Sequence, residues 1–178
     1  MEDKKRITEL INGIKSDNAE LVLSTLKEVR KEGSTAIIPE LLLLLNNTNN
    51  EEIKKSITNL LNDLKDKKAV PHIIKAIKNK KYFNILHTLI SSCWESGLDY
   101  SKYLNIFIDL CLTSEYLIAL EAFTVIENMQ EIVDENEKNI ALKKLKDSII
   151  LEKNNEKQTL LNELVKIVKD INLDKEVI

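Results

Sequence analysis

The chain has 178 residues, of which 43% are hydrophobic and 31% charged, so one soluble domain with a packed core is the first expectation. A net charge of −3 gives no general attraction to nucleic acid or anionic membranes, and no apolar run approaches the 18 residues of a membrane span. Only three glycines, two prolines and two cysteines occur, which favours helices joined by short turns and excludes a disulfide framework.

The N-terminal segment carries helical patterning rather than an apolar signal core, and we therefore expect a cytoplasmic protein with free thiols. Apolar residues at i, i+3, i+4 and i+7 predict its first helix over 7–14. The same spacing returns about every 32 residues in segments that we name the B helices, and such a period indicates stacked helical repeats. Their apolar positions are Ile7, Leu10, Ile11 and Ile14; Ile38, Leu41, Leu42 and Leu45; Val70, Ile73, Ile74 and Ile77; Tyr103, Ile106, Phe107 and Leu110.

A second family of segments, the A helices, alternates with the first. Its stripe positions are Val22, Leu26, Val29 and Arg30; Ile53, Ile57, Leu60 and Leu61; Leu86, Ile90, Cys93 and Trp94; Ile118, Ala122, Val125 and Ile126. After residue 130 the register is lost, but two further stripes still predict helices: Ile140, Ala141, Leu145 and Ile149, then Leu160, Leu161, Leu164, Val165 and Val168. We expect the best-patterned positions to be buried, namely Leu42, Ile57, Leu61, Ile74 and Ile77.

Proline and glycine agree with these boundaries. Pro39 and Pro71 fall near the start of their B helices, where a missing N–H costs little because the first four amides have no partner within the helix. Gly33 and Gly97 fall where A helices should end, which suits a left-handed cap residue.

The segments NNEEIKKSITNLLNDLKDKKAVPHIIKAIKN and STAIIPELLLLLNN resemble short HEAT repeats of the kind found in phycobilin-lyase-like HEAT proteins. Proline opens the second helix of each hairpin, whereas tetratricopeptide repeats, the nearest competitor, place it at the end. The Asp–Arg pair that the family often carries is not expected here. The resemblance implies an all-α superhelix, or α-solenoid, as a single domain over 1–178. Residues 1–16 would form an N-terminal capping half-repeat, 17–130 three A–B repeats plus a fourth A helix, and 131–178 an irregular C-terminal helical cap.

Chemical motifs are missing from the sequence. No metal-ligand, nucleophile-elbow or phosphate-binding pattern occurs, and neither His72 nor His87 has a ligand partner at helical spacing. Cys93 and Cys111 should lie beyond disulfide reach on their two helices, and we interpret Cys93 as a core residue. We therefore expect a protein that is not an enzyme, with no catalytic residue, cofactor or metal.

All eight aromatic residues fall between Tyr82 and Phe123. Residues 82–130 contain one basic residue, Lys102, and six acidic residues. An aromatic, sparsely charged region is typical of an interface core, but a packed interior or a self-association surface fits it as well.

The B-helix positions that lie off the predicted core stripes remain partly apolar, which suits a groove for an amphipathic helix or an extended peptide. We expect a protein or peptide partner there, so that the fold acts as a non-catalytic scaffold. The chain itself could be a monomer, and the sequence leaves its oligomeric state open. The expected contact residues are Leu43, Leu44, His72, Lys75, Ala76, Asn105 and Ile108, with Tyr100 and Tyr103 as aromatic anchors.

Closer packing of the B helices against one another would explain the same pattern. Three other functions also stay open: an enzyme or enzyme accessory resembling the bilin lyases, one resembling the HEAT-like DNA glycosylases, and a structural protein that self-associates. The B-helix positions off the core stripes, which also include Glu40 and Leu112, carry one lysine and one glutamate and so offer no basic channel for phosphates. We therefore expect no nucleic-acid partner and, from the charge, no membrane partner.

Overall fold

The computed structural model describes residues 4–32 and 34–172, and the regular structure within these ranges is entirely helical. The predicted all-α class is thus confirmed, and no described helix is long and apolar enough to cross a membrane. The α-helices are α1 (Lys4–Ile14), α2 (Ala19–Glu32), α3 (Ile38–Asn47), α4 (Glu51–Asn62), α5 (Val70–Ile77), α6 (Leu86–Glu95), α7 (Leu104–Thr113), α8 (Tyr116–Glu127), α9 (Glu135–Ile149) and α10 (Asn155–Asp170). Short 3-10 helices precede α3, α5, α6 and α7: η1 (Thr35–Ile37), η2 (Lys67–Ala69), η3 (Lys80–Ile85) and η4 (Ser101–Tyr103).

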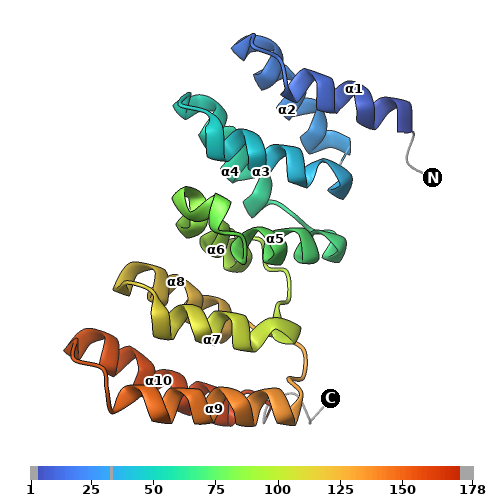
Figure 1. Ribbon diagram of the computed structural model, residues 1–178. Helices are drawn as coiled ribbons and strands as arrows, with labels where there is room; N and C mark the ends of the chain where they lie inside the picture. Colours follow the sequence, from blue (N-terminus) through green and yellow to red (C-terminus); the bar gives the residue numbers. More distant parts are fainter. Residues whose placement is uncertain (1–3, 33, 173–178) are drawn as a thin grey trace. The chain divides into compact units, whose positions relative to one another are not determined.

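The chain divides into two compact units, residues 1–98 with α1–α6 and residues 99–178 with α7–α10. Inside each unit the odd-numbered helices pack side by side in one layer and the even-numbered helices in a second (Figure 1). Each odd-numbered helix also packs against the even-numbered helix that follows it. The predicted B helices are therefore α1, α3, α5 and α7, and the A helices α2, α4, α6 and α8. The single domain and its internal boundaries at 16/17 and 130/131 stay predictions.

Local sequence signals explain the helix ends. Pro39 and Pro71 occupy the first turns of α3 and α5, as predicted, and a 3-10 turn capped by a side chain precedes each of them. Ser34 Oγ accepts a hydrogen bond from the Ala36 N–H, and Asp66 Oδ1 accepts one from the Lys68 N–H. Gly97 follows α6 with φ of 67°, the left-handed conformation predicted for it, while Gly33 lies outside the described residues.

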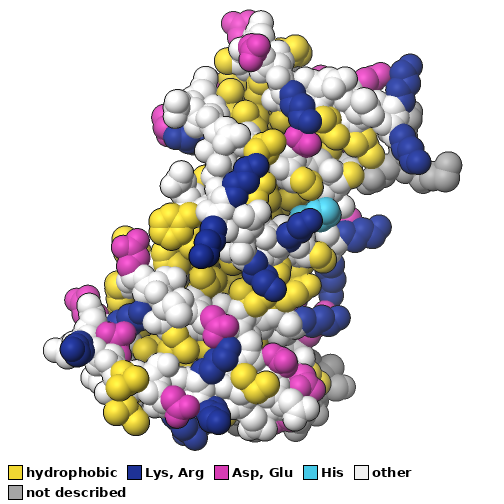
Figure 2. Space-filling view, viewed as in Figure 1, with side chains coloured by type: hydrophobic (Ala, Val, Ile, Leu, Met, Phe, Trp, Pro, Cys, Tyr) yellow, Lys and Arg dark blue, Asp and Glu magenta, His cyan; other side chains and the backbone are white. Residues whose placement is uncertain are grey.

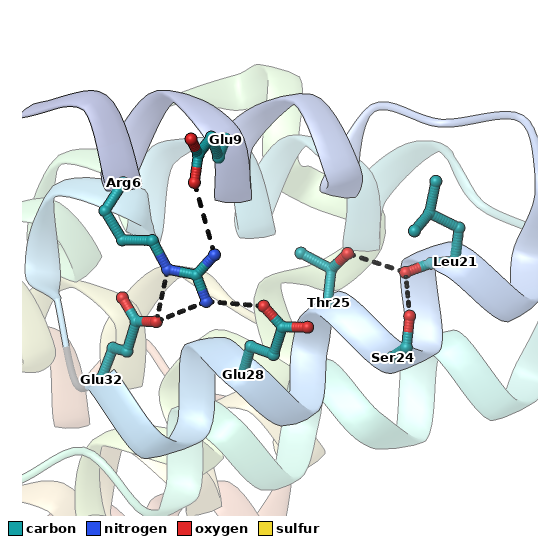
Figure 3. Close-up of polar contacts among 7 residues, drawn as sticks. All are labelled: Arg6, Glu9, Leu21, Ser24, Thr25, Glu28 and Glu32. Carbon is teal, nitrogen blue, oxygen red and sulfur yellow. Dashed lines mark hydrogen bonds and ion pairs between the residues drawn. The ribbon is translucent and has the colours of Figure 1, made fainter.

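Helix α1 is attached to α2 by one close backbone approach and one polar cluster. A Cβ atom added at Gly13 would lie 2.4 Å from Thr25 Oγ1 and 2.9 Å from Thr25 Cγ2, so only glycine fits there without movement. Nearer the N-terminus, Arg6 donates to Glu32 and Glu28 at 2.7 Å each, and those two hydrogen bonds raise the pKa of Arg6 above its usual value (Figure 3). The cluster is half exposed, so it orients the two helices more than it stabilises them.

The best-patterned positions are buried as predicted: Leu42, Ile57, Leu61, Ile74 and Ile77. Two stripes, however, are displaced by one residue. The buried positions of α7 are Leu104, Phe107, Ile108 and Cys111, which follow those of α5 by 34 residues, whereas the predicted Tyr103, Ile106 and Leu110 are only partly buried.

The stripe of α6 shifts the other way. Ile85, Leu89 and Cys93 are buried at a spacing of 32 from α4. Of the predicted stripe, Ile90 and Cys93 are buried, whereas Leu86 and Trp94 are partly exposed. The physical reason is the length of the connections that contain η3 and η4. A turn can gain or lose one residue without changing the hydrophobic spacing inside the helices that it joins.

The last two helices keep the layered packing after the sequence register has been lost. Helix α9 packs against α7, and α10 packs against α8. Asn172 links the segments that flank them, because its Oδ1 accepts from the Val133 N–H and its Nδ2 donates to the Val133 carbonyl, both at 2.9 Å. Of the predicted stripe on α9, Ala141 and Leu145 are buried, whereas Ile140 is exposed.

Candidate functional site

Reactive groups do not gather anywhere in the part of the chain that the structure describes. Among those residues, no three His, Cys, Asp or Glu side chains lie close enough together to hold a metal ion. Both cysteines are buried, and Cys93 belongs to the core as predicted. Burial raises the pKa of the Cys111 thiol to about 12, so little thiolate forms at neutral pH.

In the first unit, four of the five predicted contact residues on α3 and α5 are at least partly exposed. Leu43 and Leu44 are partly exposed and line a depression of about 400 Å³. The rest of its lining is Ile14, Lys15, Ser16, Asp17, Glu40 and Asn47. His72 is partly exposed and Lys75 exposed, but Ala76 is only 4% exposed, so the prediction that Ala76 leaves the core was wrong.

In the second unit, two of the predicted contact residues are core residues. Ile108 is 0% and Tyr100 2% exposed, and the Tyr100 ring packs edge-on against Phe107 with ring centroids 5.8 Å apart. Both predictions were wrong: the displaced stripe of α7 turns Ile108 inward, and Tyr100, in the connection before η4, packs on Phe107. Tyr103 is only partly exposed. Asn105 already donates to Glu137 of α9, at 2.9 Å to its carbonyl and 2.6 Å to its carboxylate.

Exposed lysines lie on α5 and in η3, outside the lining of the depression, which α1, the turn after it and α3 form. Lys75 on α5, Lys78 after it, and Lys80 and Lys81 in η3 are all exposed. Figure 2 shows basic and hydrophobic side chains intermingled over the odd-numbered helices of this unit. In the depression, Glu40 forms an ion pair with Lys15 at 3.1 Å, and Asp17 is a second acidic residue of the lining.

Sequence analysis missed a second cavity of about 350 Å³, where the ends of α2 and α4 meet the start of α3. Its apolar lining includes Val29, Leu41 and Leu60, which were assigned only to the core. An ion pair between Arg30 and Asp63 lies at this cavity, although no Asp–Arg pair was expected. The available signal was Arg30 itself, a charged residue at a stripe position.

The second unit contains two internal polar anchors. Asp99 accepts hydrogen bonds from Ser101, Gln130 and Glu131; burial alone would raise the pKa of its carboxyl, but these bonds outweigh burial and hold the pKa below its usual value. The buried ammonium of Lys157 donates to the carbonyls of Leu112 and Ser114 at 3.0 and 2.6 Å, so it caps the C-terminal end of α7. Both anchors hold helices in place and leave no reactive group exposed.

The odd-numbered helices of the first unit thus carry partly exposed leucines, Leu43 and Leu44 on α3, and an exposed lysine, Lys75 on α5. Neither a protein-family model nor a curated protein matches this chain.

Proposed function

We propose that this chain is a non-catalytic scaffold that binds a protein or peptide through the odd-numbered helices of its first unit. In this proposal the fold is an α-solenoid of HEAT-like hairpins. The two-layer packing inside each unit supports the proposal, because stacked hairpins of this kind present one row of helices as a continuous binding surface.

One observation carries the functional proposal. Leu43 and Leu44 stay partly exposed in a depression that Asn47 and Glu40 border. Two adjacent, partly exposed leucines on a helix face gain free energy when an apolar group covers them. A helix or strand from a partner would supply that cover, with the polar border fixing its orientation.

Affinity purification of the tagged full-length protein from its native cells, followed by mass spectrometry, tests this proposal. Leu44→Glu places a charge in the depression, whereas Leu21→Glu places one at an exposed leucine of α2 in the other layer. We expect a partner that the wild type and Leu21→Glu retain and that Leu44→Glu loses. A set of partners identical for all three proteins would contradict the proposed surface.

Self-association is the second candidate, and exposed leucines of α8 favour it. Leu117 and Leu120 are 62% and 38% exposed and lie three residues apart on one side of that helix. Light scattering over a range of concentrations tests this candidate. A mass that rises with concentration in the wild type and stays monomeric in Leu117→Glu would support it, and a constant monomeric mass would rule it out.

A further inference from the structure

We infer that the partner segment is an acidic amphipathic peptide, whose apolar side chains fill the depression at Leu43 and Leu44 while its carboxylates pair with Lys75 and Lys78. This inference rests on the proposed function and adds the chemistry of the partner. The inference depends on one observation: Leu43 and Leu44 are partly exposed on α3, and lysines without an ion pair among the described residues lie on and directly after the neighbouring α5.

The distance between the two groups follows from the repeat. Lys75 follows Leu43 by 32 residues, and the buried stripes of α3 and α5 are related by the same 32 residues. Because α3 and α5 are neighbours in one layer, equivalent positions lie about 8–10 Å apart. An α-helix is about 10–12 Å wide with its side chains, so one bound helix can reach both groups.

The charges on this face are unbalanced. The side-chain ammonium groups of Lys75 and Lys78 have no ion pair or hydrogen bond with any of the residues that the structure describes. By contrast, Glu40 is paired with Lys15, and Glu9 lies 3.5 Å from Arg6; Asp17, on the α1 side of the depression, is the acidic residue of its lining that has no ion pair among the described residues. A partner's carboxylates would therefore meet free ammonium groups without displacing an existing ion pair.

The net charge of the whole first unit also favours an acidic partner. Residues 1–98 contain 16 Lys and Arg against 13 Asp and Glu, whereas residues 99–178 contain 10 against 16. The first unit is thus cationic within an acidic protein. Complementary charge accelerates association and selects among partners more than it adds affinity, so the leucine depression must supply much of the binding energy.

A nucleic acid would also meet the lysines, but it would leave the leucines without an apolar partner. Phosphate contacts supply nearly all of nonspecific binding to nucleic acid and need a row of cations. Here the depression carries Glu40, Asp17 and Lys15 together, which does not form such a row. The peptide is therefore the occupant that uses both features of the surface.

The test begins with a displayed library of random peptides about 15 residues long, roughly four helical turns, selected on the full-length protein. We expect the enriched peptides to combine apolar residues at i, i+3 and i+4 spacing with an excess of Asp and Glu. The most enriched peptide, fluorescently labelled, then reports affinity by anisotropy at low salt and at about 150 mM salt.

Charge reversal on matched surfaces identifies the contact. Lys75→Glu combined with Lys78→Glu should weaken binding at least tenfold and reduce its dependence on salt. The control pair, Lys27→Glu with Lys55→Glu on α2 and α4, changes the net charge equally in the other layer and should alter affinity less than twofold.

The depression needs its own variants. Leu44→Glu should abolish binding, and Asn47→Trp, at an exposed position on its edge, should fill the depression and weaken binding even if Leu44→Glu impairs folding.

Three results would overturn the inference, and they differ in what they leave standing. Enriched peptides that are basic or uncharged, yet sensitive to Leu44→Glu or Asn47→Trp, refute the acidic partner and keep the proposed function. Peptides that bind equally well to both depression variants refute the proposed surface as well. A lysine-dependent affinity for a short RNA or DNA duplex that exceeds the affinity for the selected peptide refutes a peptide as the occupant.

Discussion

Replacing Gly13 by alanine should destabilise the attachment of α1 to α2, although the same change in an open helix would be stabilising. The new Cβ would lie 2.4 Å from Thr25 Oγ1 and 2.9 Å from Thr25 Cγ2. Rotation of the threonine can move only one of these two atoms away at a time, and it would also break the 2.7 Å hydrogen bond from Oγ1 to the Leu21 carbonyl. The helices must therefore separate.

The magnitude follows from two opposing terms. Overpacking of a well-packed contact costs about 1–3 kcal/mol. Exchanging a glycine inside a helix for alanine returns about 0.5–1 kcal/mol. We therefore expect Gly13→Ala to reduce stability by about 1 kcal/mol, measured by urea unfolding and by hydrogen exchange of peptides that cover residues 4–32.

The second part of this prediction is that Gly13→Ala changes from destabilising to stabilising once Thr25 is replaced by alanine. In a Thr25→Ala background both clashing atoms are gone and only the Cβ of residue 25, 3.1 Å away, remains near the new methyl group. Gly13→Ala should there stabilise the protein by about 0.5 kcal/mol. Ser24→Ala is the control, since Ser24 Oγ donates to the same Leu21 carbonyl (Figure 3) and is not among the three atoms nearest to a Cβ at Gly13. If Gly13→Ala stabilises the wild type as well, α1 and α2 do not approach as closely as the structure has them.

Three further predictions concern the second unit. Asp99→Asn should cost about 1–3 kcal/mol at neutral pH. Because the pKa of Asp99 is lowered in the folded state, this contribution is present above the unfolded pKa of about 3.9 and is lost as the pH falls through the folded value. The free energies of unfolding of wild type and Asp99→Asn, measured in urea at several pH values, should therefore converge in acid. A stability difference independent of pH would contradict this prediction. Lys157→Met should cost about 1–3 kcal/mol in thermal unfolding by removing two charge-assisted hydrogen bonds, and an unchanged melting temperature would mean that burying the ammonium costs as much as those bonds contribute. Cys111 should not react with a thiol reagent until the protein unfolds in guanidinium, because its thiol is buried with a pKa of about 12; rapid labelling of the native protein would refute this.

Hydrophobic spacing predicted the helices well, because a helix that packs on one side needs apolar residues at i, i+3, i+4 and i+7 whatever its neighbours are. The same spacing failed at α6 and α7 by a single residue. Ile108 shows the consequence of this error. One residue corresponds to about 100° around an α-helix, so the prediction assigned Ile108 to the binding surface although it lies in the core.

The candidate surface was predictable only where the register held. Leu43 and Leu44 follow Leu41 and Leu42 directly, so their position on the helix did not depend on any connection, and they line the depression as partly exposed residues. Tyr100 lies in a connection, where spacing says nothing about direction, and its burial against Phe107 was not foreseen.

The sequence by itself determined that this protein is all helical, roughly where its helices begin and end, and which stripes of α2 to α5 are buried, because these features depend on local spacing and on residues such as Pro39, Pro71 and Gly97. Only the tertiary structure decided the register of α6 and α7 and the contacts between distant residues. Gly13 against Thr25, Arg30 with Asp63, and Lys157 at the end of α7 each join residues of different helices. Their pairing depends on how the connections orient whole helices, which spacing along one helix does not encode.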